Sequence, residues 1–346
     1  MDHREHERAA MLRALELAAT PGVPPGPNPR VGCVLLAPDG TTVAAGRHRG
    51  AGTPHAEVDA LGRAGDRARG ATAVVSLEPC NHTGRTGPCA TALVDAGVAR
   101  VVFAQSDPNP QAAGGAATLR AAGVDVEGGL LADDAAALNR GWSFAVVHRR
   151  PLVTWKLATT LDGRVAAADG TSRWITSPVA RRDGQRLRTE CDAILVGTGT
   201  VLADDPRLTR RGDDGELPRD QQPTRVVMGL RELPSTAQVL DDAAPTVVLA
   251  TRDPAEALAA LHRHEIRHVL LEGGPTLAAA YLTAGLVDEV VAHVAPALLG
   301  AGRSAVADLG IGTIADTLRL DVSDVTVLGD GPDTTVRVTA APRGRD

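Results

Sequence analysis

One histidine, one glutamate and two cysteines of this chain stand at spacings that suit a reactive metal ion. His55-Ala56-Glu57 places a carboxylate two residues after an imidazole, and Cys80 and Cys89 each follow a proline. Imidazole and thiolate are ligands that Zn²⁺ prefers, and three protein ligands leave a fourth position open for water. Zinc in such a site lowers the pKa of its bound water to about 7. We therefore predict a zinc site at His55, Cys80 and Cys89, with Glu57 as the group that moves protons.

A lone histidine or cysteine is most often an ordinary core residue, but three ligand-type residues beside an offset carboxylate form a more specific pattern. A structural zinc would need a fourth cysteine or histidine at finger-like spacing. His82, which lies between the two cysteines, is the best candidate for that position. A substrate contact or a surface position is the alternative for His82. A non-catalytic binding module stabilised by zinc is the competing interpretation of the whole pattern.

The elements that must position these residues follow from the hydrophobic pattern. Residues 73–77 predict a buried strand that ends shortly before Cys80, and Cys89 opens a helix that ends near residue 97. His55 lies in the first turn of another helix, expected over 55–61. Ligands placed where strands end and helices begin meet outside the sheet, where open α/β folds place their sites.

Strand and helix signals alternate through both halves of the chain, which predicts sheets with helices on both faces. In the first half we expect further helices over 3–19, 115–122 and 132–147, and further strands over 31–36, 42–46, 98–104 and 124–128. In the second half we expect a loop over 210–222, helices over 180–189, 255–262 and 275–283, and strands over 153–157, 193–196, 224–228, 246–249, 268–271 and 287–294. The basic, proline-stopped segment His148–Pro151 separates two domains, which we place at 1–147 and 151–346.

The composition argues against nucleic-acid-binding and membrane-spanning proteins. A net charge of -6 and an aromatic content of 2% argue against a nucleic-acid partner. The N-terminus is charged, and no run approaches the roughly 18 apolar residues of a membrane span. We expect a cytoplasmic protein with no membrane association. Cys33 and Cys191 lie in apolar runs and are predicted to be buried free thiols.

The spacing of the two cysteines separates this chain from the common nucleoside and nucleic-acid deaminases, which use Pro-Cys-x-x-Cys. Eight residues, Asn81–Pro88, stand between the cysteines here. This longer loop resembles the riboflavin-pathway deaminase, whose pattern is P-C-S-H-x-G-[RK]-T-P-P-C. Other segments similar to that family are Pro27–Gly32, Gly52–Glu57 and Asp107–Pro110. The departures from its pattern, none of them a zinc ligand, are Asn81, Thr83 and Gly87.

The second half of the chain resembles the reductase that is fused to that deaminase. Its similar segments, in family order, are Lys156–Arg164, Trp174–Ser177, Thr200–Thr209 and Glu272–Leu277. The last of these runs from a predicted strand through Gly-Gly-Pro into a helix, a turn at which a phosphate can approach the backbone. The chain is therefore similar to the bifunctional riboflavin biosynthesis deaminase–reductase family. This resemblance implies an N-terminal cytidine-deaminase-like α/β/α domain and a C-terminal dihydrofolate-reductase-like α/β domain.

The resemblance also implies roles for individual residues. Glu57 would be the catalytic proton shuttle, and Asn28 and His48 would be substrate contacts, although ordinary loop and surface roles compete for these two. The residues implied to contact NADPH are Ala158, Trp174, Thr200, Asp204, Gly274, Pro275, Thr276, Leu277, Ala278, Ala279 and Ala280. Those implied to contact the reductase substrate are Lys156, Ser172, Arg188, Leu208, Arg211 and Glu272.

Arg188 and Arg211 suit the phosphate of the substrate because guanidinium pairs with phosphate bidentately. The ordinary alternatives are a solvated face for the arginines and a core position for Trp174. Met228–Leu230 stands where the family usually has an Asp-Ser-type segment near the cofactor, which puts one NADPH contact in doubt.

The implied substrate is a diaminopyrimidinone that carries a phosphoribosylamino group. Zinc-dependent hydrolysis would remove the exocyclic amine, and NADPH would then give a hydride to C1 of the ring-opened ribose to leave a ribityl chain. We also expect a homo-oligomer of two or more chains. The rival enzyme is a cytidine- or tRNA-adenosine-type deaminase with an unrelated C-terminal domain.

Overall fold

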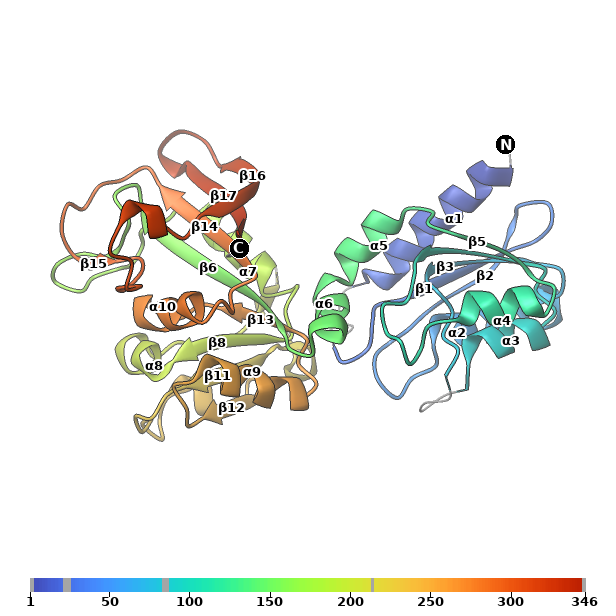
Figure 1. Ribbon diagram of the computed structural model, residues 1–346, viewed down its shortest axis with the longest axis horizontal. Helices are drawn as coiled ribbons and strands as arrows, with labels where there is room; N and C mark the ends of the chain where they lie inside the picture. The colour runs from blue at the N-terminus through green and yellow to red at the C-terminus, as the bar shows by residue number, and fades with distance from the viewer. Residues whose placement is uncertain (1–2, 21–25, 83–86, 213–214, 344–346) are drawn as a thin grey trace. The chain divides into compact units, whose positions relative to one another are not determined.

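The protein is described from a computed structural model, in which residues 3–20, 26–82, 87–212 and 215–343 are placed. The chain divides into two compact units, Met1–Arg149 and Arg150–Asp346 (Figure 1). Among the placed residues, no helix has the length and apolar character needed to cross a membrane.

The N-terminal unit is a five-stranded sheet between two layers of helices. The strand order is β2-β1-β3-β4-β5. Strand β1 is antiparallel to β2 and β3, whereas β3, β4 and β5 run parallel. The strands are β1 (Gly32–Leu36), β2 (Thr42–Arg47), β3 (Thr72–Leu77), β4 (Arg100–Gln105) and β5 (Asp125–Gly128). The helices are α1 (His3–Ala18), α2 (Ala56–Ala64), α3 (Cys89–Asp95), α4 (Gly115–Ala121), α5 (Ala132–Leu138) and α6 (Arg140–His148).

Alternation along the strands produces two cores in this unit. Cys33, Leu35 and Val75 point to the face covered by α2, α3 and α4, while Val34 and Val74 point to the face covered by α1 and α5. Burial on both faces explains why β1 and β3 are continuous apolar runs rather than alternating ones. The helices that carry the candidate ligands therefore lie on one side of the sheet.

The C-terminal unit is built on an eight-stranded sheet of order β12-β11-β8-β13-β6-β14-β17-β16. The first six strands in this order run parallel to one another. The last two, β17 and β16, are antiparallel to their neighbours. These strands are β6 (Leu152–Thr160), β8 (Ala193–Gly197), β11 (Thr224–Met228), β12 (Thr246–Leu249), β13 (His268–Leu271), β14 (Glu289–Ala295), β16 (Leu320–Leu328) and β17 (Thr335–Pro342). Two short pairs lie outside this sheet: β7 (Arg164–Ala166) with β15 (Arg303–Ser304), and β9 (Arg211–Gly212) with β10 (Gly215–Glu216).

Helices cover both faces of the parallel strands in the C-terminal unit. Helices α9 (Pro254–Arg263) and α10 (Pro275–Thr283) pack on one face through Leu258, Leu261 and Tyr281. Helices α7 (Pro178–Leu187) and α8 (Thr198–Asp204) cover the other face through Leu187 and Val201. The carboxyl ends of these parallel strands lie at one edge of the sheet, so the residues that follow the strands lie together at the edge where open α/β folds bind ligands.

Most predicted elements are confirmed, two differ from the prediction, and several further elements were not predicted. The helix expected over 132–147 is divided into α5 and α6 at Asn139, whose backbone is not helical (φ -107°, ψ 17°). The side chain of Asn139 pairs there with both backbone groups of Arg30. The loop expected over 210–222 contains the short β9–β10 ladder, with residues 213–214 outside the described chain. Helix α8 and the β16–β17 pair were not predicted. The prediction of buried free thiols at Cys33 and Cys191 is confirmed.

Candidate functional site

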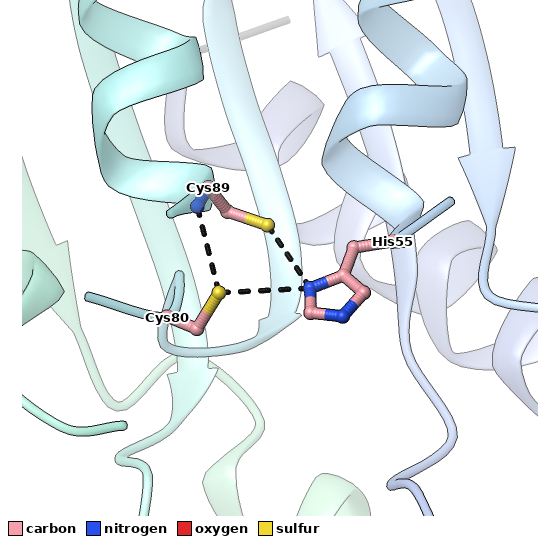
Figure 2. Close-up of side chains that lie close together, drawn as sticks. All are labelled: His55, Cys80 and Cys89. Carbon is pink, nitrogen blue, oxygen red and sulfur yellow. Dashed lines mark hydrogen bonds between the residues drawn. The ribbon is translucent and has the colours of Figure 1, made fainter. Parts of the chain in front are cut away.

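Three side chains of the N-terminal unit converge as a metal site. The ligand atoms of His55, Cys80 and Cys89 all lie within 4.8 Å of one another. His55 Nδ1 lies 3.2 Å from Cys89 Sγ and 3.6 Å from Cys80 Sγ, as Figure 2 shows. One imidazole nitrogen and two thiol sulfurs suit Zn²⁺. His55 directly precedes α2, Cys80 follows β3, and Cys89 is the first residue of α3, which confirms the predicted meeting of strand ends and helix starts.

The chemistry of the cysteines fits metal binding. Hydrogen bonds from Cys89 and His55 lower the pKa of the Cys80 thiol to about 4. The thiolate is the form in which cysteine binds a metal. The backbone N–H of Cys89 also donates to Cys80 Sγ, at 3.5 Å. His82, the candidate for a fourth ligand, is not a member of the cluster of ligand atoms. Three protein ligands are the pattern of a catalytic rather than a structural zinc.

Glu57 is placed to handle protons at this site. It lies in the first turn of α2 and is only 3% exposed. Burial raises the pKa of its carboxyl to about 7, and the nearby Cys80 adds to this increase. A carboxyl that titrates near neutral pH can both accept and release a proton during a reaction. The position of Glu57 therefore suits the proton shuttle that the sequence predicts.

Asn28 and His48 come together beside the metal ligands. Asn28 Nδ2 lies 2.9 Å from His48 Nε2, and His48 Nδ1 lies 3.0 Å from the carbonyl oxygen of Pro54. The ring of His48 meets that of His55 edge to face, with centroids 5.3 Å apart. Both predicted contacts thus border the site. Of the departures from the family pattern, Thr83 lies outside the described residues and has no structural account.

A buried carboxylate fixes the turn that carries Cys80. Glu78 accepts hydrogen bonds from the backbone N–H groups of Ala116, at 3.0 Å, and Asp107, at 3.2 Å. A Cβ on Gly115 would stand 1.7 Å from the carbonyl oxygen of Pro79, so the start of α4 can approach this turn only with glycine there. Sequence reasoning did not assign Glu78 or Gly115 a role. The position of Glu78 in Glu-Pro-Cys was the available signal.

The C-terminal unit brings three of the predicted substrate contacts together. Arg188 donates to both carboxylate oxygens of Glu272, at 2.8 and 2.6 Å, and to the carbonyl oxygen of Thr209, at 2.7 Å. Burial lowers the pKa of the neighbouring Lys156. Although burial opposes the change, Arg188 and Lys156 together lower the pKa of Glu272. The site thus holds a half-buried carboxylate that is stabilised by two cations.

The remaining predicted substrate contacts are differently exposed. Ser172 is half-buried, Leu208 is buried, and Arg211 is exposed on β9. The Arg211 backbone N–H donates to the Gln185 side chain. Since the guanidinium of Arg188 is already paired with Glu272, Arg211 is the more open of the two arginines for a phosphate.

Two of the predicted NADPH contacts, Thr200 and Gly274, lie next to each other. Thr200 Oγ1 lies 3.9 Å from the point where a Cβ on Gly274 would stand. Gly274 precedes α10, and Pro275 occupies the first helical position. Thr276 is exposed and Leu277 and Ala280 are half-buried, whereas Ala278 and Ala279 are buried, Ala278 within the core. Ala158 is half-buried on β6.

Trp174 is 70% exposed, so its alternative explanation as a core residue is wrong. The guanidinium of Arg181 stacks on its ring, 4.5 Å from the centroid. Arg173, the residue before it, donates to the carbonyl oxygen of Asp204 at 3.2 Å. An exposed indole held in this way offers a flat face to a ligand.

The segment Asp204–Leu208 is held by residues that sequence reasoning missed. The Gln238 backbone N–H donates to Asp205 Oδ1 at 2.8 Å, and Gln238 Nε2 donates to the Asp205 carbonyl oxygen at 2.7 Å. Arg225, fully buried on β11, donates to the Arg207 carbonyl oxygen and to Asp241. Asp205 and Leu208 both have positive φ, at 41° and 51°, conformations that only such surrounding contacts maintain. No local pattern marks residues so distant in sequence as partners.

Comparison with known proteins finds one matching family model in each unit of the chain. Residues 4–105 match the model of the cytidine and deoxycytidylate deaminase zinc-binding region, and residues 151–336 match the RibD C-terminal domain. The riboflavin biosynthesis protein RibD of Mycobacterium tuberculosis is 52% identical over 304 residues, covering 88% of this chain and 89% of that protein. RibD of Escherichia coli is 40% identical over 364 residues, covering 96% and 98%.

Solved structures agree over nearly the whole length. Acinetobacter baumannii RibD has a TM-score of 0.87 at 39% identity, covering 98% of this chain and 99% of that one. A deaminase/reductase of Thermotoga maritima has a TM-score of 0.86 at 30% identity, covering 99% and 100%. The two competing interpretations, a nucleoside-type deaminase with an unrelated second domain and a non-catalytic zinc module, are therefore wrong.

We predict that Gly115→Ala weakens zinc binding. The new Cβ would overlap the Pro79 carbonyl oxygen, so the turn that ends in Cys80 must shift away from the other ligands. Zinc content measured by atomic emission should fall below one equivalent. The matched control is Gly62→Ala, a glycine of α2 with open space around it. That change should keep zinc and raise stability by about 0.5–1 kcal/mol. Full zinc occupancy in Gly115→Ala would contradict the account.

The chemical nature of the metal ligands, the two matching family models and the similarity over the full chain lead to one conclusion: this chain belongs to the RibD family of bifunctional riboflavin biosynthesis deaminase/reductases.

Proposed function

We propose that residues 1–147 deaminate 2,5-diamino-6-(5-phosphoribosylamino)pyrimidin-4(3H)-one to 5-amino-6-(5-phosphoribosylamino)uracil, and that residues 151–346 reduce the ribosyl group of this product to a ribityl chain. The Thermotoga maritima relative carries the names of these two activities. The observation that carries the proposal is the convergence of His55, Cys80 and Cys89 around a site that Glu57 borders.

In the deaminase half, Zn²⁺ held by His55, Cys80 and Cys89 supplies Lewis acidity toward water. Glu57 accepts one proton from the attacking water and passes it to the ring nitrogen, then carries the remaining hydroxyl proton to the amine, which leaves as ammonia as the carbonyl forms. Burial keeps this carboxyl in a range where both transfers are possible at neutral pH. Asn28 and His48 bind and orient the pyrimidine beside these groups, because their paired side chains border His55.

In the reductase half, RibD enzymes use NADPH, which supplies the hydride when bound. Lys156 in the middle of β6 and Glu272 directly after β13 bind the sugar, and Arg188 orients Glu272 through its two hydrogen bonds. Arg211, with Ser172 and Leu208, completes the substrate side, and its exposed guanidinium suits the phosphate. The cofactor side comprises Ala158, Trp174, Thr200, Asp204 and the segment Gly274–Ala280.

We propose that the enzyme is a homo-oligomer in the cytoplasm. Strand β16 forms an edge of its sheet and leaves Val322, Val325 and Val327 exposed by 58%, 61% and 64%. Exposed apolar edge strands favour pairing with another chain. All four cysteines are free thiols, as is usual in a reducing compartment, which supports the location. Light scattering should give a mass of at least twice the 35.6 kDa of one chain, and a monomer at working concentration would contradict the proposal.

We predict that Glu57→Gln abolishes ammonia release while zinc stays bound. Glutamine keeps the size of the side chain but cannot accept a proton, so the rate should fall by about 10²- to 10⁴-fold. Ammonia release and metal content are measured on the same preparation. The control is Asp95→Asn, an exposed carboxylate of α3, which should retain full activity. Deamination at the wild-type rate by Glu57→Gln would reject the shuttle role.

We predict that Asp204→Ala damages reduction and leaves deamination intact. The carboxylate of Asp204 is exposed and proposed to contact NADPH, so its loss should disturb the NADPH side alone, since alanine keeps the carbonyl oxygen that Arg173 contacts. Oxidation of NADPH and release of ammonia are followed separately, with products identified by mass. An equal loss of both activities would show that the substitution acts through general instability.

A further inference from the structure

Arg231 has a free guanidinium at the end of a parallel strand. It follows β11 by three residues and is exposed. Within the part of the chain that the structure places, it makes no hydrogen bond or ion pair. Arg173 and Arg188, which lie near the same edge, are engaged with Asp204 and Glu272. The guanidinium of Arg231 is therefore available for a ligand.

The position of the Arg231 guanidinium is set by two glycines. Its Nη2 lies 2.7 Å from the point where a Cβ on Gly199 would stand, so the guanidinium rests directly on the backbone of α8. Gly229 has a φ of +142°, and a Cβ there would stand 2.6 Å from Thr198 Oγ1. Because Met228 of β11 pairs with Gly197 of β8, the chain after β11 folds back over the chain after β8. Arg231 therefore reaches sideways across the ends of two neighbouring strands.

The order of the strands indicates which part of NADPH would meet Arg231. The sheet order is β11-β8-β13-β6, and the residues proposed to contact NADPH follow it: Ala158 on β6, Gly274 after β13 and Thr200 after β8. The reacting nicotinamide must lie near Lys156 and Glu272, on β6 and after β13, where the substrate binds. The adenosine end must then lie toward β11, the next strand outward (Figure 1). Arg231 stands at that end.

We propose that Arg231 binds the 2′-phosphate of NADPH and selects this cofactor over NADH. A guanidinium presents a planar fork of donors that matches phosphate bidentately and keeps its charge at every physiological pH. NADH differs from NADPH only in lacking that phosphate, so the contact acts on the difference between the two. No ion pair with a placed residue has to break before the phosphate binds. The inference rests on the proposed reductase function.

The test measures nucleotide binding rather than catalysis. Adenosine 2′,5′-bisphosphate carries the 2′-phosphate and 5′-AMP lacks it, and both are titrated by calorimetry into the full chain. We expect the wild type to bind the bisphosphate more tightly. Arg231→Ala should weaken bisphosphate binding by about 10- to 100-fold and leave 5′-AMP binding unchanged. Arg231→Lys, which keeps the charge without the fork, should lie between the two.

A matched control distinguishes a specific contact from general charge. Arg263 is an exposed arginine at the end of α9, which leads to the start of β13 and thus to the opposite edge of the sheet. Arg263→Ala should leave the binding of both nucleotides as in the wild type. Ammonia release, which the other domain catalyses, should be unchanged in every variant and checks that the chain is folded.

Two results would overturn the inference: a wild type with no preference for the bisphosphate, or an Arg231→Ala variant that keeps the preference. Neither would affect the proposed reductase function if the wild type still reduces the deaminated product with NADPH. Conversely, a bisphosphate preference that depends on Arg231, in a protein unable to perform that reduction, would support the phosphate site and reject the proposed reaction.

Discussion

The metal centre depends on one close contact, that between the start of α4 and the turn after β3. Two sulfurs and an imidazole nitrogen belong to three separate segments, and they can share a metal only if the Glu78–Cys80 turn is held in place. Gly115 permits that contact because it has no Cβ to collide with the Pro79 carbonyl oxygen. Glu78 secures it by accepting two backbone hydrogen bonds from different segments. These contacts fix where the three ligands meet, as a site of defined geometry requires.

In the reductase half, charged side chains hold the proposed substrate contacts in position. The side chain of Glu272 is only 13% exposed, and a carboxylate so shielded from water would be unfavourable without partners. Arg188 pairs with it bidentately, and Lys156 adds a second cation. Arg225 and Gln238 hold the segment around Asp205 in a backbone conformation that isolated residues seldom adopt. Polar groups therefore hold the segments that carry the proposed ligand contacts, while apolar side chains of the flanking helices hold both faces of the sheet.

Both halves use glycine where one backbone must rest on another group. At Gly115 the contact is with a carbonyl oxygen, and at Gly199 and Gly229 it is with a guanidinium and a threonine hydroxyl. A side chain at any of these positions would separate the segments that the site needs to join. Gly62 and Gly285 have open space around them, so a glycine in the sequence does not by itself reveal such a contact.

The sequence alone determined the chemistry: the zinc ligands, the offset carboxylate, the order of the reductase motifs and most strands, because residue type and hydrophobic period are local properties. Only the tertiary structure decided what depends on neighbours distant in the chain. The break at Asn139 comes from a pairing with Arg30, and α8 and the β16–β17 pair needed the sheet to define them. The exposure of Trp174, the pairing of Arg188 with Glu272 and the freedom of Arg231 are likewise relations between segments. Hydrogen bonds and steric contacts between such segments leave no periodic trace in the sequence.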